Sequence, residues 1–201
     1  MNVQGSLLPP EPDDIPAALD IEIIRQAIDV EEADRVFRRL LDEVAWTQER
    51  VTMFGRVMDI PRLTAWYGDP GRTYTYSGIA LTPQSWTPLL EELRASVECL
   101  AGCRFNSVLL NLYRNGNDSV SWHADDEPDL GRTPIIGSLS LGASRRFEFR
   151  KRTDHGERFR VTLDAGDVVV MRGTSQQLWE HQLPKDKVTE PRINLTFRRI
   201  G

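Results

Sequence analysis

The sequence predicts one mainly β domain, an antiparallel sandwich or barrel with two helices packed on its outside. A chain of 201 residues with 40% hydrophobic and 27% charged residues has the length and composition of a single globular domain. Beyond Gly102, short β-type runs alternate with turn signals, and no helical stretch separates them. Strands that follow one another without crossover helices pair antiparallel, so this pattern excludes a parallel α/β sheet.

The first half of the chain is expected to hold both helices. Residues 1–18 contain four prolines and few apolar residues, which predicts a flexible lead-in. A short strand is expected within 21–28, and the Gly-, Pro- and aromatic-rich segment 51–82 indicates short strands joined by long loops. The helices are predicted from apolar residues at helical spacing: Ala33, Val36, Phe37, Leu40, Leu41 and Val44 in the first, and Trp86, Leu89, Leu90, Leu93, Val97 and Leu100 in the second.

The second half is expected to form the β core. Turn signals such as Asn115-Gly116 separate its apolar runs. We therefore expect a single domain over 19–201, in which 19–102 supply the helices and 103–201 supply the core. The predicted strands of the core are 108–113, 135–141, 147–149, 159–163, 168–171 and 193–197.

The net charge of −5 is unevenly distributed along the chain. Residues 1–50 hold 12 acidic and 5 basic residues, whereas the rest holds 18 and 20, so the acidic sum does not exclude a nucleic-acid partner. Apolar runs such as 168–171 are far shorter than the roughly 18–20 residues of a membrane span. The first residues lack the basic and apolar regions of a secretion signal. We expect a cytoplasmic protein, nuclear if its source is a eukaryote, that does not bind a membrane.

Two of the three histidines and one aspartate form a candidate metal site. His123 and Asp125 make a His-x-Asp pair, and His181 follows far downstream. On a strand, residues i and i+2 point to one face, so the pair could reach one ion together with His181 from a distant strand. Two imidazoles and one carboxylate that leave positions open are the facial triad of non-haem Fe(II) oxygenases. The alternative is a surface His123 and a half-buried His181 without a metal.

The last predicted strand, within 192–198, has one polar face and one apolar face. Two guanidinium groups that flank Asn and Thr would suit a dicarboxylate bound in a pocket. An exposed strand could show the same alternation, which is the alternative interpretation. The polar positions on this strand and on the strand at 108–113 are Arg192, Asn194, Thr196, Arg198, Asn111 and Tyr113.

These residues resemble the AlkB family of Fe(II)- and 2-oxoglutarate-dependent dioxygenases. The resemblance runs from about Met53 to the C-terminus and is closest to the branch of the animal homologue that repairs duplex DNA. It implies a double-stranded β-helix, or jelly roll, as the core of the fold. The motifs that carry it are Pro61-Arg62, Tyr67-Gly68-Asp69, Tyr74-Thr75-Tyr76-Ser77-Gly78, His123-x-Asp125-Asp126-Glu127, His181 and Pro191-Arg192-x-Asn194-Leu195-Thr196-Phe197-Arg198.

The resemblance also implies the cofactors and their ligands. It makes His123, Asp125 and His181 the iron ligands, with positions left for 2-oxoglutarate and O2. It puts Arg198 and Tyr113 at the distal carboxylate of 2-oxoglutarate, where a bidentate Arg–carboxylate pair is strong and selective. The remaining cosubstrate residues that it implies are Asn111, Arg192, Asn194 and Thr196.

The reaction implied by the resemblance is oxidative removal of N-alkyl groups from DNA bases, such as 1-methyladenine and 3-methylcytosine. Hydroxylation of an N-methyl carbon gives a hemiaminal that loses formaldehyde, while 2-oxoglutarate becomes succinate and CO2. A base must leave the duplex to reach the iron, and Phe54, beside Gly55 and Arg56, is expected to fill the gap. The residues expected at the lesion, in a recognition region within 19–102 and beside the iron, are Tyr74, Thr75, Tyr76, Asp126 and Glu127.

A basic hairpin between 145 and 160 holds seven basic and three acidic residues and is expected to contact phosphates. A solvated charged face is the alternative. We expect a monomer that acts on alkylated DNA, with RNA as a second open substrate. Two other functions remain open: a 2-oxoglutarate oxygenase acting on RNA or protein, and a non-catalytic metal-binding β-barrel, which would have no use for the Arg192 and Arg198 face.

Overall fold

The structure is a computed structural model of the chain. It describes residues 15–53, 55–71, 74–76, 79–81 and 83–201, and the side chains of 53, 74–76 and 79–81 lie outside that description. Most of the expected lead-in, residues 1–14, therefore lies outside the described residues. Its last part is tied to the core, because the indole N–H of Trp179 donates a hydrogen bond to the Ala18 carbonyl oxygen at 3.1 Å.

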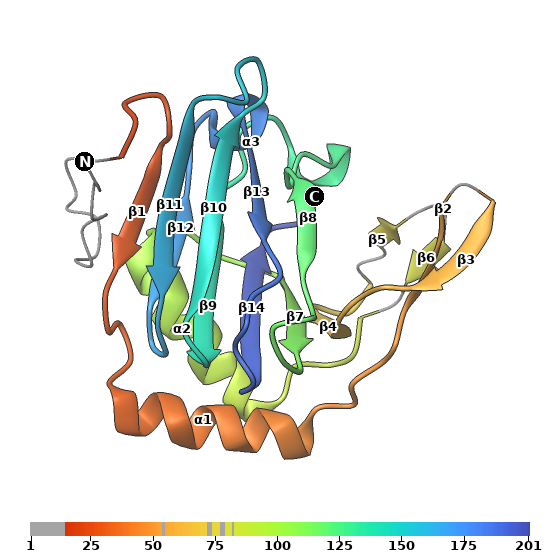
Figure 1. The fold of residues 1–201 in the computed structure, drawn as a ribbon. Coiled ribbons are helices and arrows are strands. Elements are labelled where there is room, and N and C mark those ends of the chain that lie inside the picture. Colours follow the sequence, from red (N-terminus) through yellow and green to blue (C-terminus); the bar gives the residue numbers. More distant parts are fainter. Residues whose placement is uncertain (1–14, 54, 72–73, 77–78, 82) are drawn as a thin grey trace.

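Two antiparallel sheets face each other and form the body of the fold (Figure 1). This arrangement confirms the predicted mainly β class and is compatible with a jelly roll. The larger sheet has the order β1 (Ile21–Ile24), β12 (Val168–Met171), β9 (Ile136–Gly142), β14 (Arg192–Arg198), β7 (Ser107–Tyr113) and β4 (Leu63–Gly68). The smaller sheet has the order β11 (Arg158–Leu163), β10 (Arg145–Lys151), β13 (Trp179–Leu183) and β8 (Val120–His123).

Strand β14 lies inside the larger sheet, between β9 and β7. In its register with β7, Arg192 pairs with Tyr113 and Asn194 pairs with Asn111. The apolar residues of β14 pack in the cluster that also contains the buried residues of the helices. Because side chains alternate along a strand, the polar residues of β14 point the other way, into the space between the sheets.

Two helices pack against the larger sheet from outside: α2 lies behind it, and α1 runs across the lower ends of its strands (Figure 1). Helix α1 (Val30–Glu43) begins after Asp29, whose side chain accepts a hydrogen bond from the backbone of the first turn at 3.0 Å. Helix α2 (Pro88–Ala101) ends at Gly102, which has a φ of 69°, a left-handed conformation that glycine adopts without strain. Both predicted helices are confirmed. None of the helices in the described part of the chain is long and apolar enough to cross a membrane.

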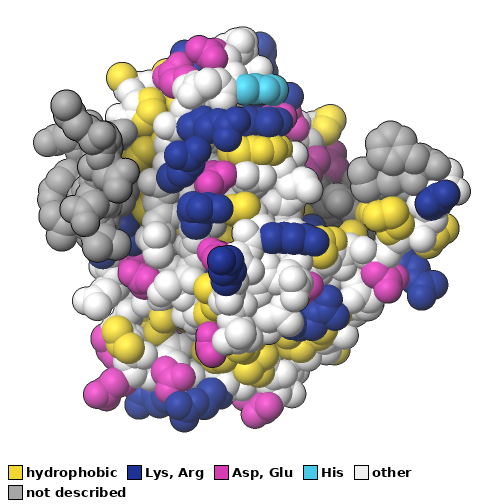
Figure 2. Space-filling model, in the orientation of Figure 1, with side chains coloured by type: hydrophobic (Ala, Val, Ile, Leu, Met, Phe, Trp, Pro, Cys, Tyr) yellow, Lys and Arg dark blue, Asp and Glu magenta, His cyan; other side chains and the backbone are white. Residues whose placement is uncertain are grey.

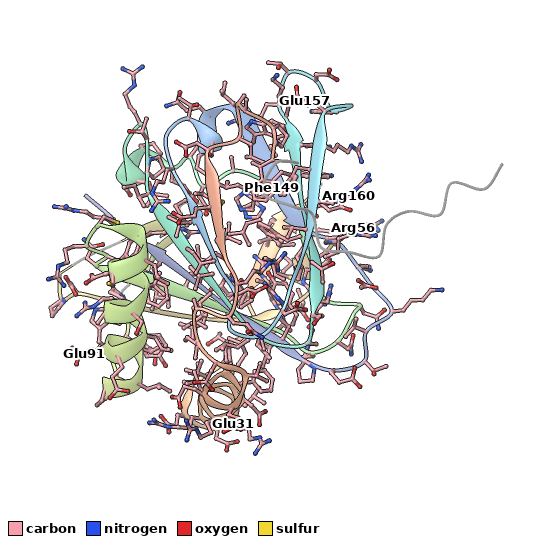
Figure 3. The ribbon with its side chains drawn as sticks, turned by 90° about the vertical axis from the view of Figure 1, so that its left-hand side faces the viewer. Glu31, Arg56, Glu91, Phe149, Glu157 and Arg160 are labelled. Carbon is pink, nitrogen blue, oxygen red and sulfur yellow. The ribbon has the colours of Figure 1, made fainter. Side chains whose placement is uncertain are left out.

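A second apolar cluster fills part of the space between the two sheets. Phe149 from the smaller sheet and Met171 from the larger one are almost fully buried in it. Figure 3 shows Phe149 between the sheets, Arg160 on the outer side of the smaller sheet and Glu157 at the tip of the hairpin that joins β10 and β11. Met171 and Phe147 of this cluster also line the cavity that contains the candidate site.

Two short hairpins stand beside the paired sheets, on the side of β8 (Figure 1). The loop that follows the first hairpin is attached to the segment before β8, because the Ser119 N–H donates to the Pro61 carbonyl oxygen at 2.9 Å. The hairpins are β2 (Arg50–Met53) with β3 (Arg56–Asp59) and β5 (Tyr74–Tyr76) with β6 (Ile79–Leu81). The other described elements are the short helix α3 (Ser175–Leu178) and a 3-10 turn (Pro128–Leu130).

Candidate active site

The structure brings the three candidate metal ligands together. His123 is the last residue of β8, and His181 lies opposite it in the middle of β13. The centroids of their rings are 4.2 Å apart. The two histidines and Asp125 each offer one ligand atom, and these atoms lie within 4.8 Å of one another. A strand pairing thus joins residues that are far apart in the sequence.

Asp125 reaches the cluster in a different way from the one that its spacing predicts. The prediction that it shares a strand with His123 is wrong, because β8 ends at His123. Two hydrogen bonds fix Asp125 instead. Its backbone N–H donates to Gln176 Oε1 at 2.9 Å, and its Oδ1 accepts from Arg198 Nη2 at 2.6 Å. These two hydrogen bonds fix Asp125 in place of the strand pairing that a residue within β8 would have.

The site keeps its ligands in the protonation states that bind a metal. Burial raises the pKa of Asp125, but the charges of Arg198, His181 and His123 and the Arg198 hydrogen bond lower it overall to about 2. Burial, followed by the charge of His123, lowers the pKa of His181 to about 3. At neutral pH the cluster therefore presents an ionised carboxylate beside a neutral imidazole at His181.

The backbone fixes the tautomer of His123. Its Nδ1 lies 2.8 Å from the carbonyl oxygen of Ser121. Because a carbonyl oxygen can only accept, Nδ1 carries the proton and Nε2 is the nitrogen left for a metal. A bond of this kind also orients the ring of a metal-binding histidine. Two imidazoles and one carboxylate on the wall of a cavity are a donor set that suits Fe(II).

The ligand cluster lies on the wall of a cavity of about 530 Å³. This volume falls within the roughly 300–1,000 Å³ of small-molecule sites. Both sheets and the β2–β3 hairpin contribute to the walls. All six polar positions that the sequence analysis selected line it: Asn111, Tyr113, Arg192, Asn194, Thr196 and Arg198.

A buried cation lies in this cavity, and it has no acidic partner among the residues that the structure describes. Arg192 is 2% exposed, donates to Ser140 Oγ at 2.9 Å and lies over the ring of Tyr113 at 5.6 Å. Among the described residues no acidic group pairs with it, and its Nε has no hydrogen-bond partner. Burial lowers the pKa of Arg192 to about 10, so the guanidinium stays charged at neutral pH. A buried charge of this kind is costly unless a ligand neutralises it, so Arg192 fits a carboxylate.

The two arginines of β14 lie at opposite ends of the strand. Arg198 contacts the metal-ligand candidate Asp125, whereas Arg192 faces Tyr113. The expectation that Arg198 binds the distal carboxylate of 2-oxoglutarate stays a prediction. Arg192 beside Tyr113 is a second candidate for that carboxylate, at the end of β14 away from the metal-ligand cluster.

The remaining polar wall residues hold one another in place. Asn194 Nδ2 donates to Ser138 Oγ at 2.8 Å, and Thr196 Oγ1 donates to Asn194 Oδ1 at 2.9 Å. Asn111 Oδ1 accepts from Arg62 Nε at 2.7 Å. Arg62 is a cavity residue that the sequence analysis did not select, although the Pro61-Arg62 pair was part of the resemblance. Such a network keeps the wall rigid and polar.

The residues expected at the lesion are only partly described. Phe54 lies outside the described residues, and of Tyr74, Thr75 and Tyr76 only the backbone, in β5, is described. Gly55, at the turn between β2 and β3, has a φ of 74°, and Arg56 is exposed. The cavity wall includes Val51, Thr52 and Met58 of the same hairpin.

The two acidic residues after Asp125 are placed differently. Glu127 lines the cavity. Asp126 is exposed, forms an ion pair with Arg152 at 2.7 Å and is not among the lining residues described. The structure therefore supports a place at the cavity for Glu127, and it directs Asp126 toward the β10–β11 hairpin.

Acidic partners neutralise much of the positive charge of the expected basic hairpin. Arg145 is buried and donates to three backbone carbonyl oxygens, so its expected phosphate contact is wrong. Figure 2 shows basic side chains over this face with acidic ones between them. Arg146 and Arg160 both pair with Glu148, and other pairs are Arg150 with Glu180, Lys151 with Glu157 and Arg152 with Asp126. A phosphate role of the exposed residues stays a prediction.

The fold and the site define a class of protein, the oxygenases that bind Fe(II) and 2-oxoglutarate inside a β sandwich. A family model described as the 2OG-Fe(II) oxygenase superfamily matches residues 20–198. Two solved structures share the fold: OsALKBH1, with a TM-score of 0.66 and 21% identity over 89% of this chain and 97% of the other, and a Pseudomonas putida prolyl-4-hydroxylase, with a TM-score of 0.55 and 16% identity over 92% and 95%.

Within that superfamily, the chain belongs to the AlkB homologues. It is 48% identical over 183 residues to alpha-ketoglutarate-dependent dioxygenase alkB homolog 3 of Bos taurus, covering 86% of this chain and 63% of that protein. It is 41% identical over 180 residues to the DNA oxidative demethylase ALKBH2 of Mus musculus, covering 84% of this chain and 75% of that protein. The chain spans 63% of the length of the bovine and human homolog 3 proteins. The resemblance of the motifs to the AlkB family is thus confirmed.

Proposed function

We propose that this chain is an oxidative demethylase that removes N-alkyl groups, such as those of 1-methyladenine and 3-methylcytosine, from DNA with Fe(II), O2 and 2-oxoglutarate. One observation carries the proposal. One cavity holds the His123, Asp125 and His181 cluster at one end. At the other end it holds the buried Arg192, which pairs with no acidic residue in the part of the chain that the structure describes. A metal-binding barrel without a cosubstrate would not need that second feature.

The residues of the cavity divide between the metal and the cosubstrate. His123, Asp125 and His181 would hold Fe(II), which in this class supplies hydroxylation of an unactivated C–H bond with O2 and 2-oxoglutarate. Arg192 and Tyr113 would bind the distal carboxylate, and the Asn194–Thr196 pair would form the polar wall between the two ends. Arg198 would hold the carboxylate of Asp125 in place.

The reaction that we propose balances without a further reductant. One oxygen atom of O2 enters the N-methyl carbon and the other enters succinate, because 2-oxoglutarate loses CO2 and supplies two electrons. The C–N bond of the hemiaminal then breaks. Its electron pair stays on the base nitrogen, the carbon leaves as formaldehyde, and the hydroxyl proton of a cationic base passes to water. The carboxylates among the described lining residues are Asp59, Asp125 and Glu127. A negative charge at Glu127 would favour a cationic methylated base.

Two observations favour a nucleic-acid substrate. Relatives that are 41% identical carry the name DNA oxidative demethylase. In this chain, the β2–β3 hairpin contributes to the cavity wall, and it carries exposed Val57 and Met58. Exposed apolar side chains beside a cavity suit contacts with an unstacked base. We propose alkylated DNA as the partner. A DNA substrate would be met in the cytoplasm of a bacterium or in the nucleus of a eukaryote. We also propose that the protein acts as a monomer.

The test is release of succinate and formaldehyde from methylated DNA and RNA oligonucleotides of one sequence, measured side by side. Equal amounts of succinate and formaldehyde are expected with methylated DNA. No formaldehyde is expected with unmethylated DNA or with the Asp125→Ala protein. Formaldehyde and succinate released from methylated RNA but not from methylated DNA would show that the protein is an RNA demethylase. Succinate without formaldehyde on either polymer would overturn a nucleic-acid substrate, and full activity of Asp125→Ala would overturn the metal site.

A further inference from the structure

We propose that Gln176 is a positioning residue that places the backbone of Asp125 for metal binding, an inference that rests on the proposed function. Gln176 Oε1 accepts a hydrogen bond from the Asp125 N–H at 2.9 Å, and both residues are 2% exposed. Arg198 holds the carboxylate of the same residue. Asp125 is therefore fixed at two points, one on its backbone and one on its side chain.

The position of Asp125 in the fold explains why a backbone contact is needed there. The ladder between β8 and β13 includes the pair His123 and His181, and β8 ends at His123. Asp125 lies two residues beyond that end, so in the described part of the chain no strand pairing determines the position of its backbone. A buried N–H without a partner is strongly unfavourable, and Gln176 supplies the acceptor that a neighbouring strand would otherwise provide.

The chemistry of the contact determines how the Gln176 amide is oriented. A backbone N–H can only donate, so the amide must present its oxygen to Asp125. Its Nε2 then points the other way and lies 3.3 Å from the sulfur of Met171, which lines the cavity. The side chain thus links the loop of Asp125 to strand β12, both of which border the site.

Gln176 is itself held firmly, which a positioning residue requires. It lies in the short helix α3, five residues before His181. Its carbonyl oxygen accepts from Arg152 Nη1 at 3.2 Å, and the same nitrogen pairs with Asp126 at 2.7 Å. One segment of chain therefore carries the ligand His181 and the residue that places the ligand Asp125, and Arg152 clamps that segment to the Asp125 loop.

The test compares full-length variants that each change one glutamine of α3. Gln176→Met removes the acceptor and keeps an unbranched side chain of similar size, whereas Gln176→Glu keeps an oxygen acceptor. Gln177→Met is the matched control, because the exposed Gln177 also makes a hydrogen bond between its side chain and the backbone, as a donor to the Arg132 carbonyl oxygen. No hydrogen bond joins Gln177 to Asp125 in the described part of the chain. The readout is the dissociation constant of Mn(II), with no nucleic acid and no turnover.

We expect Gln176→Met to raise the Mn(II) dissociation constant about 10- to 100-fold, the usual effect of removing an outer partner of a metal ligand. Gln176→Glu should stay within about threefold of wild type, and Gln177→Met should not differ from it. In metal-free protein, the Asp125 amide should exchange its hydrogen faster in Gln176→Met and at the wild-type rate in Gln177→Met. A role in packing alone would lower thermal stability without this pattern.

Equal Mn(II) affinity of Gln176→Met and wild type would overturn the inference and leave the proposed function standing. Equal weakening in Gln177→Met would also overturn it, because the effect would then come from α3 as a whole. If Gln176→Met does not fold, Gln176→Asn decides, since its shorter amide cannot reach the Asp125 N–H, and wild-type affinity in that variant would overturn the inference. A wild-type protein without one Mn(II) site per chain would overturn the proposed function together with it.

Discussion

Arg198 Nη2 lies 2.6 Å from Asp125 Oδ1, although the two residues are 73 positions apart in the sequence. Arg198 ends β14 of the larger sheet, and Asp125 follows β8 of the smaller one. The bond therefore joins the two sheets at the ligand cluster. Both side chains are mostly buried, at 11% and 3% exposure, where a charge-assisted hydrogen bond is short and strong.

Replacement of Arg198 should weaken metal binding. Arg198→Met leaves the buried carboxylate of Asp125 without its cationic partner and free to rotate, so we expect the Mn(II) dissociation constant to rise about 10- to 100-fold. Arg199→Met, which changes the exposed neighbour of Arg198, is the control and should bind as wild type does. Titration calorimetry measures both. If Arg198→Met keeps wild-type metal affinity and raises the KM for 2-oxoglutarate more than about tenfold, Arg198 binds the distal carboxylate of 2-oxoglutarate and does not position Asp125.

Replacement of Arg192 should weaken binding of the cosubstrate and leave metal binding unchanged. Loss of an ion pair in a buried pocket costs roughly 2–5 kcal/mol, and each 1.4 kcal/mol is about tenfold, so Arg192→Met should raise the KM for 2-oxoglutarate by more than tenfold. The control is a ligand, 2-oxopentanoate, which lacks the distal carboxylate and should compete equally well in both proteins. A parallel loss for both ligands would show that Arg192 acts on the whole cavity.

The helices and most core strands could be predicted because their patterns are strong and local. Helix α1 carries its apolar stripe over a full 14 residues, and α2 has Pro88 at its start and Gly102 at its end. Strands such as β12, with four buried apolar residues, are equally clear. Neither β8 nor β13 is among the strands that the apolar runs predict, and only the metal-site hypothesis for His123, Asp125 and His181 required strands there. Each mixes polar and apolar residues, because one face lines the cavity or meets solvent, and this weakens a signal based on hydrophobicity.

The site could be predicted as a set of residues and only in part as an arrangement. The polar face of β14 and the His123, Asp125 and His181 set follow from residue type and alternation. The roles of the two arginines on β14 could not be assigned, because the sequence does not indicate whether Arg192 or Arg198 lies beside the metal ligands. Gln176 carries no signal of its own: a glutamine acquires a role here only through a loop packed beside it. Such tertiary contacts are beyond a single sequence.

The buried His181 should make the metal-free protein less stable as the pH falls. Its pKa is about 3 when folded and about 6.5 when unfolded, so between these values the unfolded state binds the extra proton. The free energy of unfolding should therefore fall as the pH drops below 6.5, by about 2 kcal/mol at pH 5, at roughly 1.4 kcal/mol per unit. Asp125, whose pKa is lowered to about 2 in the folded state, adds to this loss of stability only when the pH falls below its unfolded-state pKa of about 3.8.

Urea unfolding at pH 7 and pH 5, in the presence of a chelator, measures this effect. The loss of stability between the two pH values should be about 2 kcal/mol smaller in His181→Asn than in wild type. The other two histidines are present in both proteins, so the comparison isolates His181. An equal loss in both proteins would mean that His181 is not held neutral in the folded state.

The β2–β3 hairpin allows the sharpest test of the substrate. Phe54, which lies outside the described residues, stands between Met53 at the end of β2 and Gly55 before β3. If its ring fills the gap left by a flipped base, Phe54→Ala should lose stacking worth roughly 1–3 kcal/mol only where a stack must be refilled. Activity on a methylated duplex should then fall about 5- to 150-fold, and activity on the same lesion in a single strand should change little.

The control for this prediction is Val57→Ala, which shortens an exposed apolar side chain of the β2–β3 hairpin and should affect the two substrates alike. All rates must be measured at one salt concentration, because basic residues that contact phosphates make both affinities depend on salt. An equal loss on duplex and single strand in Phe54→Ala would indicate a damaged hairpin. No loss on either substrate would make Phe54 an ordinary packing residue, and the demethylase would then be one that acts on bases already unpaired, in single-stranded DNA or in RNA.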